Sequence, residues 1–287
     1  YHGLQPRSDA AAASPRTRHS VSAVLITLNA EATLEATLAA LDWCDEILVI
    51  DSGSTDNTLS ICRRHGCEVQ QAPFAGFGPQ KQLAVLSAKH DWVFAIDADE
   101  VVSTELRQEV ERVLSLPQPE YTGYAVRIPL VFMGRALRFG GEFHKRHLRL
   151  FNRRHGNFND ALVHERVVID GPVGQLAGPI WHHSYRNLHH YFEKFNDYTS
   201  RSARQLAERG PSPRRWLVAL RLPLVFLYLY IARGLILDGF PGFVWSALAS
   251  FHRFVRHVKQ IELEQFTGAS SRAKPVTGTS AERLRQP

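Results

Sequence analysis

Acidic and amide side chains stand at the ends of three predicted apolar strands. They are Asn29 and Glu31 after the strand 21–27, Asp51 after the strand 46–50, and Asp97 and Asp99 after the strand 92–96. Two carboxylates at positions i and i+2 of a turn can face one hard cation, and Mg2+ or Mn2+ held in this way keeps positions for substrate phosphates. An isolated Asp-x-Asp is a weak signal, but its place after an apolar strand strengthens the prediction of a divalent-metal site.

Apolar runs alternate with helical patterns over the first 120 residues. Strands are predicted at 21–27, 46–50, 68–71 and 92–96, and helices at 30–41, from 57 to about 65, at 80–89 and at 103–114. This alternation predicts an α/β fold with a mainly parallel sheet and right-handed crossovers. Ligands of such sheets bind at the carboxyl ends of the strands, so we expect the polar groups to gather there. Strands at 124–130 and 162–169 and a helix at 185–204 are predicted downstream.

Each polar group at a strand end has an alternative structural role. Asp51 could accept from a base imide N–H or a ribose hydroxyl, or it could close an Asx turn; we expect the ligand role. Asp56 is expected to cap the following helix. The stretch 27–31 has the same two possibilities, because Asn29 could cap a helix or contact a nucleotide.

Charge divides the chain into an acidic and a basic part. Residues 1–120 carry 9 Lys/Arg and 17 Asp/Glu, a balance of −8, whereas residues 121–287 carry 25 and 11, a balance of +14. A basic half suits phosphates or an anionic membrane, with a plain solvated surface as the alternative. The basic residues are not interleaved with a nucleic-acid-binding motif, so we expect no nucleic-acid partner. Three cysteines without a CxxC pair indicate neither a disulfide framework nor structural zinc, and favour a reducing compartment.

The C-terminal half contains an apolar pair of segments. Residues 216–232 carry one charge, residues 239–258 are aromatic and amphipathic, and five arginines precede the pair (Arg201, Arg204, Arg209, Arg214 and Arg215). This pattern predicts an interfacial or re-entrant helix pair on anionic lipid; the alternatives are a buried core helix and a dimer interface. We expect a membrane-associating segment at 206–262, disordered tails at 1–19 and 263–287, and no signal peptide.

The motifs at the strand ends resemble family 2 glycosyltransferases of the GT-A fold. The matching stretches are VLITLNAE (24–31), ILVIDSGSTDNT (47–58) and DWVFAIDADE (91–100). Five later stretches resemble the branch of lipopolysaccharide-core β-1,4-glucosyltransferases: FMGRALRFGG (132–141), LRLFNRR (148–154), VHE (163–165), IWHHSYRNL (180–188) and KFNDYTSRSA (194–203). The resemblance spans roughly residues 20–260. It implies a GT-A domain over 20–205, with a nucleotide-binding part at 20–120 and an acceptor part at 121–205.

The resemblance also implies roles for single residues. Those expected at the nucleotide are Thr27, Asn29, Glu31 and Asp51 in the uridine pocket, Lys81 beside it, Asp97 at the ribose or metal side, and Asp99 as the direct metal ligand. His182 could complete the shell of Mn2+ or Mg2+ from the far side of the cleft, or it could line an acceptor cleft with other histidines. Arg149, Arg153 and Arg154 could hold phosphates or form an exposed basic face.

The chemistry implied is a single in-line displacement on a UDP-sugar, which inverts an α-linked donor into a β-linked product. A metal and nearby cations stabilise the departing diphosphate, and one base deprotonates the acceptor hydroxyl. Related enzymes carry an Asp shortly before the RLF motif, but Lys145 stands there in this chain. Glu142 is therefore the first candidate base and Glu165 the second; an ion pair with a nearby arginine is the alternative for Glu142.

The expected reaction moves a hexose, with UDP-glucose as the expected donor, onto a lipid-anchored heptose of the lipopolysaccharide inner core. The expected place is the cytoplasmic face of the bacterial inner membrane. Another cell-surface polysaccharide or a polyprenyl-phosphate-linked acceptor is the alternative within enzymes. A nucleic-acid-binding protein and a catalytically inactive membrane scaffold are the alternatives from other classes.

Overall fold

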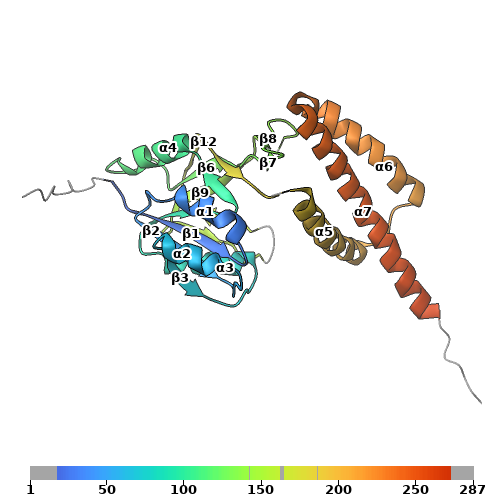
Figure 1. Cartoon of the computed structure of the whole chain (residues 1–287), viewed down its shortest axis with the longest axis horizontal. Helices are drawn as coiled ribbons and strands as arrows, with labels where there is room; N and C mark the ends of the chain where they lie inside the picture. The colour runs from blue at the N-terminus through green and yellow to red at the C-terminus, as the bar shows by residue number, and fades with distance from the viewer. Residues whose placement is uncertain (1–17, 142, 162–164, 186, 273–287) are drawn as a thin grey trace, which may run out of the picture. The chain divides into compact units, whose positions relative to one another are not determined.

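The computed structural model describes residues 18–141, 143–161, 165–185 and 187–272 (Figure 1), with side chains up to residue 266. The chain divides into two compact units. We call residues up to Leu130 together with Glu142–Ser184 the sheet unit, and Val131–Gly141 together with Tyr185 onward the helical unit. Each unit has its own packing and is described by itself.

An eight-stranded mixed sheet forms the frame of the sheet unit. Its strands, in spatial order, are β3 (Glu68–Gln71), β2 (Glu46–Asp51), β1 (Val21–Thr27), β4 (Trp92–Ala95), β9 (Arg146–Asn152), β6 (Gly123–Arg127), β12 (Val173–His182) and β5 (Glu100–Val102). The first four are mutually parallel, β9 is antiparallel to both of its neighbours, and β5 is antiparallel to β12. The predicted mainly parallel α/β sheet of the GT-A type is confirmed.

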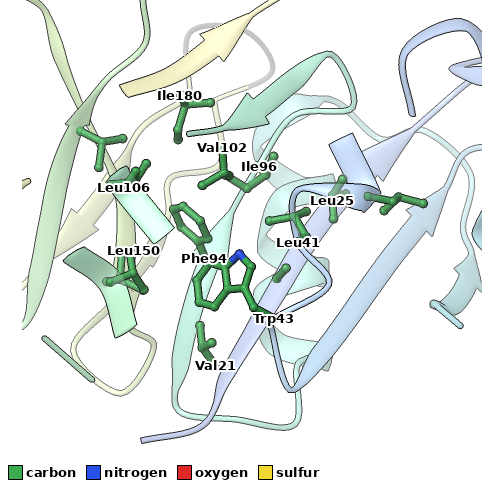
Figure 2. Packing of buried hydrophobic residues seen from close by; sticks show 14 of the residues in the cluster. Val21, Leu25, Leu41, Trp43, Phe94, Ile96, Val102, Leu106, Leu150 and Ile180 are labelled. Atoms are coloured by element: carbon green, nitrogen blue, oxygen red, sulfur yellow. The ribbon is translucent and has the colours of Figure 1, made fainter. Parts of the chain in front are cut away.

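Helices cover both faces of this sheet. They are α1 (Glu31–Ala39), α2 (Thr58–Arg64), α3 (Phe77–Ser87) and α4 (Thr104–Leu114). Successive side chains of β1 point to opposite faces of the sheet and pack in two different cores, because side chains alternate along a strand. Val21 and Leu25 pack in the larger core (Figure 2), which α1, α2 and α4 cover. Val24 packs in the smaller core with residues of α3.

The predicted elements exist, with shifted ends. The strand expected at 124–130 ends at Arg127, and α3 begins at Phe77 rather than at residue 80. Part of the strand expected at 162–169 forms β11 (Val167–Ile169), which pairs with β10 (Gly156–Phe158); residues 162–164 lie outside the described residues.

The helical unit contains α5 (Leu188–Arg209), α6 (Arg215–Leu227), a π-helical turn η1 (Tyr228–Ala232), a 3-10 turn η2 (Leu235–Asp238) and α7 (Gly239–Arg272). Aromatic contacts join these helices: Phe195 stacks on Phe251 at 5.6 Å between ring centroids, and Phe226 meets Phe243 edge-on, also at 5.6 Å. Helix α7 continues past residue 263, where a tail is expected from the sequence.

A small hairpin of β7 (Val131–Phe132) and β8 (Arg135–Ala136) completes the helical unit. Its turn residues Met133 and Gly134 both have positive φ, 51° and 74°, as a two-residue turn matched to strand twist requires. This hairpin is not predicted from the sequence, because two-residue strands have no periodic pattern.

One face of α6 and η1 is an exposed apolar stripe. It consists of Trp216, Leu220, Leu224, Leu227 and Ile231, all of which are exposed. Their spacing of three or four residues places them on one side of a helix. The segment Arg215–Ala232 is long and apolar enough to cross a membrane, and only 6% of it is buried.

Candidate active site

Thr27 and Asp51 end neighbouring parallel strands, and the register of β1 and β2 places them side by side. Asp51 is fully buried and accepts four hydrogen bonds, from Thr27 Oγ1 (3.0 Å), Ser54 Oγ (2.5 Å) and the N–H groups of Gly53 and Ser54 (both 2.9 Å). Burial raises the pKa of Asp51, but these hydrogen bonds outweigh it and the pKa is lowered. A carboxylate has about four lone-pair sites, so Asp51 is saturated by its own loop together with Thr27 of β1.

Asn29 and Glu31 join the two loops that follow β1 and β2. Asn29 Oδ1 accepts the N–H of Thr55 at 2.9 Å, and Glu31 Oε2 accepts the backbone N–H of Asn57 at 3.0 Å. Asp56, in the loop after β2, accepts two N–H groups: that of Glu31 at Oδ2 (3.1 Å) and that of Thr58 at Oδ1 (3.0 Å). The N-termini of α1 and α2 are therefore capped reciprocally.

This arrangement corrects one prediction and agrees with another. Asn29 does not cap α1, because its backbone is left-handed (φ 51°) and its amide faces the neighbouring loop. Asp56 caps α2 at its first N–H group, as expected. The roles of Thr27, Asn29, Glu31 and Asp51 at uridine remain predictions; the structure brings these side chains together and shows that they also fix one another.

Four ion pairs connect charged side chains in and around the Asp-x-Asp turn. Asp97 binds Lys81 Nζ through Oδ1 (2.7 Å) and Arg149 Nη2 through Oδ2 (2.9 Å). Arg149 also binds Glu100 at 2.5 Å, and Lys81 binds Glu165 at 2.8 Å. Both cations are buried. Arg149, expected to hold phosphates or to lie on an exposed face, instead positions two carboxylates.

Charge pairing determines which of these acids stay ionised. Burial raises the pKa of Asp97, but Arg149 and Lys81 outweigh it and hold the pKa far below its usual range. Burial raises the pKa of Glu100 to about 7, with Arg149 acting in the opposite direction. Burial lowers the pKa of Lys81, but Asp97 and Glu165 outweigh it and raise the pKa. Asp97 and Lys81 are thus a fixed pair of opposite charges.

Asp99 and His182 form a second, more open pair. Oδ2 of Asp99 lies 3.3 Å from Nε2 of His182, and the two side chains retain 26% and 32% of their exposure. The antiparallel register of β5 and β12, which sets His182 opposite Glu100, fixes the pair, and the N–H of His183 binds the Asp99 carbonyl at 2.8 Å. Burial lowers the pKa of His182, but the hydrogen bond and charge of Asp99 outweigh it and raise the pKa.

The Asp99 carboxylate and the His182 imidazole are suited to bind a Mn2+ or Mg2+ ion that also has substrate ligands. A carboxylate oxygen suits both ions and an imidazole nitrogen suits Mn2+ moderately, while substrate phosphates and water complete such shells. Within the described residues, no group of three or more His, Cys, Asp or Glu side chains could form an all-protein metal cage. Asp97 is expected as a second carboxylate ligand and remains a prediction, although both of its oxygens are already held by cations.

Of the two candidate bases, only Glu165 is among the described residues. Glu165 is held by Lys81, whose ammonium also lies 5.5 Å from the ring centroid of Phe158. Glu142, the first candidate, lies outside the described residues. Gly78, the second residue of α3, lies close to the segment 159–161. The N–H of Gly78 binds the Ala161 carbonyl, and a Cβ on Gly78 would lie 2.5 Å from that oxygen.

Comparison with known proteins identifies the family. Residues 22–168 match glycosyl transferase family 2. The chain belongs to this family of enzymes. A lipopolysaccharide core biosynthesis glycosyltransferase of Rhizobium meliloti, LpsC, is 31% identical over 83% of this chain and 91% of its own length. An uncharacterized glycosyltransferase of Rickettsia typhi is 31% identical over 85% and 87%. The crystal structure of residues 1–349 of TarS from S. aureus aligns over 87% of this chain and 92% of its own, with 12% identity and a TM-score of 0.44.

Two members of this glycosyltransferase site, Glu100 and Arg149, have roles that differ from what the sequence predicts. Glu100 directly follows the Asp-x-Asp turn and is buried against Arg149, a role for which no expectation is given. Arg149 stands in an apolar stretch of β9 between the buried side chains of Leu150 and Phe151 and the half-buried Leu148. A charged residue within a strand this apolar is a signal for a buried ion pair, because an unpaired charge is costly to bury.

Proposed function

We propose that this glycosyltransferase is inverting and metal-dependent, and that it transfers glucose from UDP-glucose onto a heptose of the lipopolysaccharide inner core. The observation that carries the proposal is the Asp99–His182 pair at 3.3 Å, next to an Asp97 held ionised by Lys81 and Arg149. The 31% identity to LpsC supports the class of acceptor. The resemblance of the downstream motifs supports glucose and the β linkage.

Asp99 and His182 would hold Mn2+ or Mg2+. When bound, the ion neutralises charge that develops on the departing diphosphate. His182 binds a metal only as neutral imidazole, so it must first lose the proton that Asp99 stabilises. Lys81 and Arg149 keep Asp97 ionised and in place. The loops after β1 and β2, which are hydrogen-bonded to each other, would position the nucleoside.

The acceptor hydroxyl must lose a proton as its oxygen attacks the anomeric carbon. Glu165 would have to leave Lys81, whose Nζ lies 2.8 Å from its Oε1, to take this proton. This pairing supports Glu142 as the proposed base and Glu165 as the anchor of Lys81. A single displacement assisted in this way inverts the anomeric configuration.

The helical unit is proposed to lie on the cytoplasmic face of the inner membrane. The apolar stripe of α6 and η1 faces outward, and Arg214 and Arg215 stand at its N-terminal end. An amphipathic helix of this kind buries its apolar face at the interface while basic side chains meet anionic headgroups. We propose peripheral or monotopic attachment rather than a multi-pass arrangement.

Release of UDP from candidate donors tests the reaction. Purified protein is incubated with UDP-glucose, UDP-galactose or UDP-N-acetylglucosamine, with a heptose-terminated core acceptor, and with Mn2+, Mg2+ or EDTA. We expect acceptor-dependent release from UDP-glucose, abolished by EDTA, and a β-linked product by NMR. Release only with a polyprenyl-phosphate acceptor would favour the alternative acceptor. Full activity in EDTA would refute the metal-dependent mechanism.

A further inference from the structure

The helical unit contains a cavity that the proposed reaction does not use. Its volume is about 300 Å3, and its lining includes Arg135, Arg138, Phe139, Leu237 and Asp238. It is formed by the FMGRALRFGG stretch, to which no role is assigned above, and by the turn η2. Specific small-molecule sites are concave and occupy a few hundred Å3 or more, whereas attraction to bulk anionic lipid needs no cavity.

The walls of this cavity are held rigidly. Asp238 accepts the backbone N–H groups of Arg138 (3.1 Å) and Phe139 (3.0 Å). Gly140 and Arg233 bind each other twice: the N–H of Gly140 donates to the Arg233 carbonyl at 2.9 Å, and Arg233 Nη2 donates to the Gly140 carbonyl at 2.8 Å. Residues 138–140 of the stretch are therefore hydrogen-bonded to the residues between α6 and α7.

Two guanidinium groups of the cavity are available to a ligand. Arg135 and Arg138 are exposed, and the ion pairs among the described residues include neither of them. Arginine binds phosphate oxygens through two parallel hydrogen bonds, which makes it suited to phosphorylated ligands. The carboxylate of Asp238 accepts one N–H group at each oxygen and keeps lone pairs for a sugar hydroxyl.

Apolar side chains border the same cavity. Leu237 is strongly exposed and Phe139 is exposed, and both line the cavity. Cationic and apolar groups around one cavity suit a ligand that is both phosphorylated and attached to lipid.

We propose that this cavity binds a phosphorylated saccharide of the lipid-anchored acceptor, with Arg135 and Arg138 on its phosphate. The inference rests on the proposed function and adds to it that the acceptor carries a phosphate, which is recognised by the helical unit. Arg135 and Arg138 thereby select phosphorylated acceptors.

Calorimetric titration with mannose 6-phosphate tests this site in the full chain. UDP and Mn2+ are present throughout, so that the donor site is filled. We expect wild-type protein to bind the hexose phosphate, R135A/R138A to bind it at least tenfold more weakly, and R135K/R138K to lie between them. Mannose, which lacks the phosphate, should bind to none of them. The control R204A/R209A removes two exposed arginines of the same unit and should bind like wild type.

Two results would overturn the proposal. One is equal affinity of R135A/R138A and wild type for mannose 6-phosphate. If R135A/R138A in that case loses binding to phosphatidylglycerol vesicles, the arginines are assigned to lipid headgroups instead. The other is an equal loss of mannose 6-phosphate binding in R204A/R209A, which would indicate diffuse charge. UDP binding is measured separately, so failure of the donor site is distinguishable from failure of this cavity.

Discussion

The Nε2 atom of His182 lies 3.3 Å from Oδ2 of Asp99, and sheet register places it there. Asp99 directly precedes β5, His182 ends β12, and the two strands pair antiparallel. Side chains of a strand alternate between faces, so a slip of one residue would turn the imidazole away from the carboxylate. The second proposed metal ligand therefore depends on the pairing of a three-residue strand.

Removal of either member of this pair should reduce transfer and weaken metal dependence. We expect Asp99→Asn and His182→Asn to lower the rate by roughly 100-fold or more, since each loses a group that stabilises the leaving diphosphate. The Mn2+ concentration for half-maximal rate should rise in both variants. Ser184→Ala removes a neighbour of His182 and should have a small effect. Unchanged metal dependence of His182→Asn, with unchanged thermal melting, would exclude the imidazole as a ligand.

The substitution Glu165→Gln tests whether Glu165 is the general base or instead holds Lys81 in place. If Glu165 anchors Lys81, the substitution should leave turnover within a few-fold of wild type, raise the KM for the donor and lower stability. Lys81→Met should be more harmful, because it leaves Asp97 and Glu165 without their shared cation. A double-mutant cycle should give a coupling of about 1–3 kcal/mol in unfolding free energy. A loss of turnover by about 100-fold or more in Glu165→Gln alone would identify it as the base.

Asp51 should contribute stability that depends on pH. Its pKa is lowered in the folded state, so its contribution is present above the unfolded value of about 3.9 and is lost as pH falls through the lower folded value. Asp51→Asn should therefore destabilise the protein by about 2 kcal/mol at pH 7, and the difference should shrink below about pH 4. Urea unfolding at a series of pH values measures this. A difference that is constant with pH would contradict the ionised, hydrogen-bonded carboxylate.

The apolar stripe of α6 and η1 should be needed for lipid binding. We expect Leu224→Glu/Ile231→Glu to abolish co-sedimentation with vesicles that contain phosphatidylglycerol, because buried apolar area is replaced by charge that anionic lipid repels. Leu86→Glu, at an exposed leucine of the sheet unit, is the matched control and should bind like wild type. If the double variant still binds vesicles and instead changes from dimer to monomer, the stripe is a subunit interface.

The sequence predicts the local parts of this structure better than the contacts between distant parts. Strand β1 has the predicted bounds, since a run of apolar residues before a polar turn is a local signal. Of the two roles considered for Asn29, the helix cap is wrong because the loop after β2, which cannot be positioned from sequence, offers its amide a better partner. Lys81, Asp97, Arg149 and Glu165 are each conspicuous in the sequence. Their pairing depends on sheet order and on long-range register, for which a single sequence has no pattern.

The close approach at Gly78 ties α3 to a segment more than 80 residues further along the chain. A Cβ at this position would lie 2.4 Å from the Asn159 carbonyl oxygen and 2.5 Å from the Ala161 carbonyl oxygen, so any larger amino acid would force the backbone at 159–161 away from α3. Exchange of Gly78 during divergence would therefore need a compensating change in the facing segment. The glycine thus restricts which pairs of mutations can arise in sequence, although it takes no part in the chemistry.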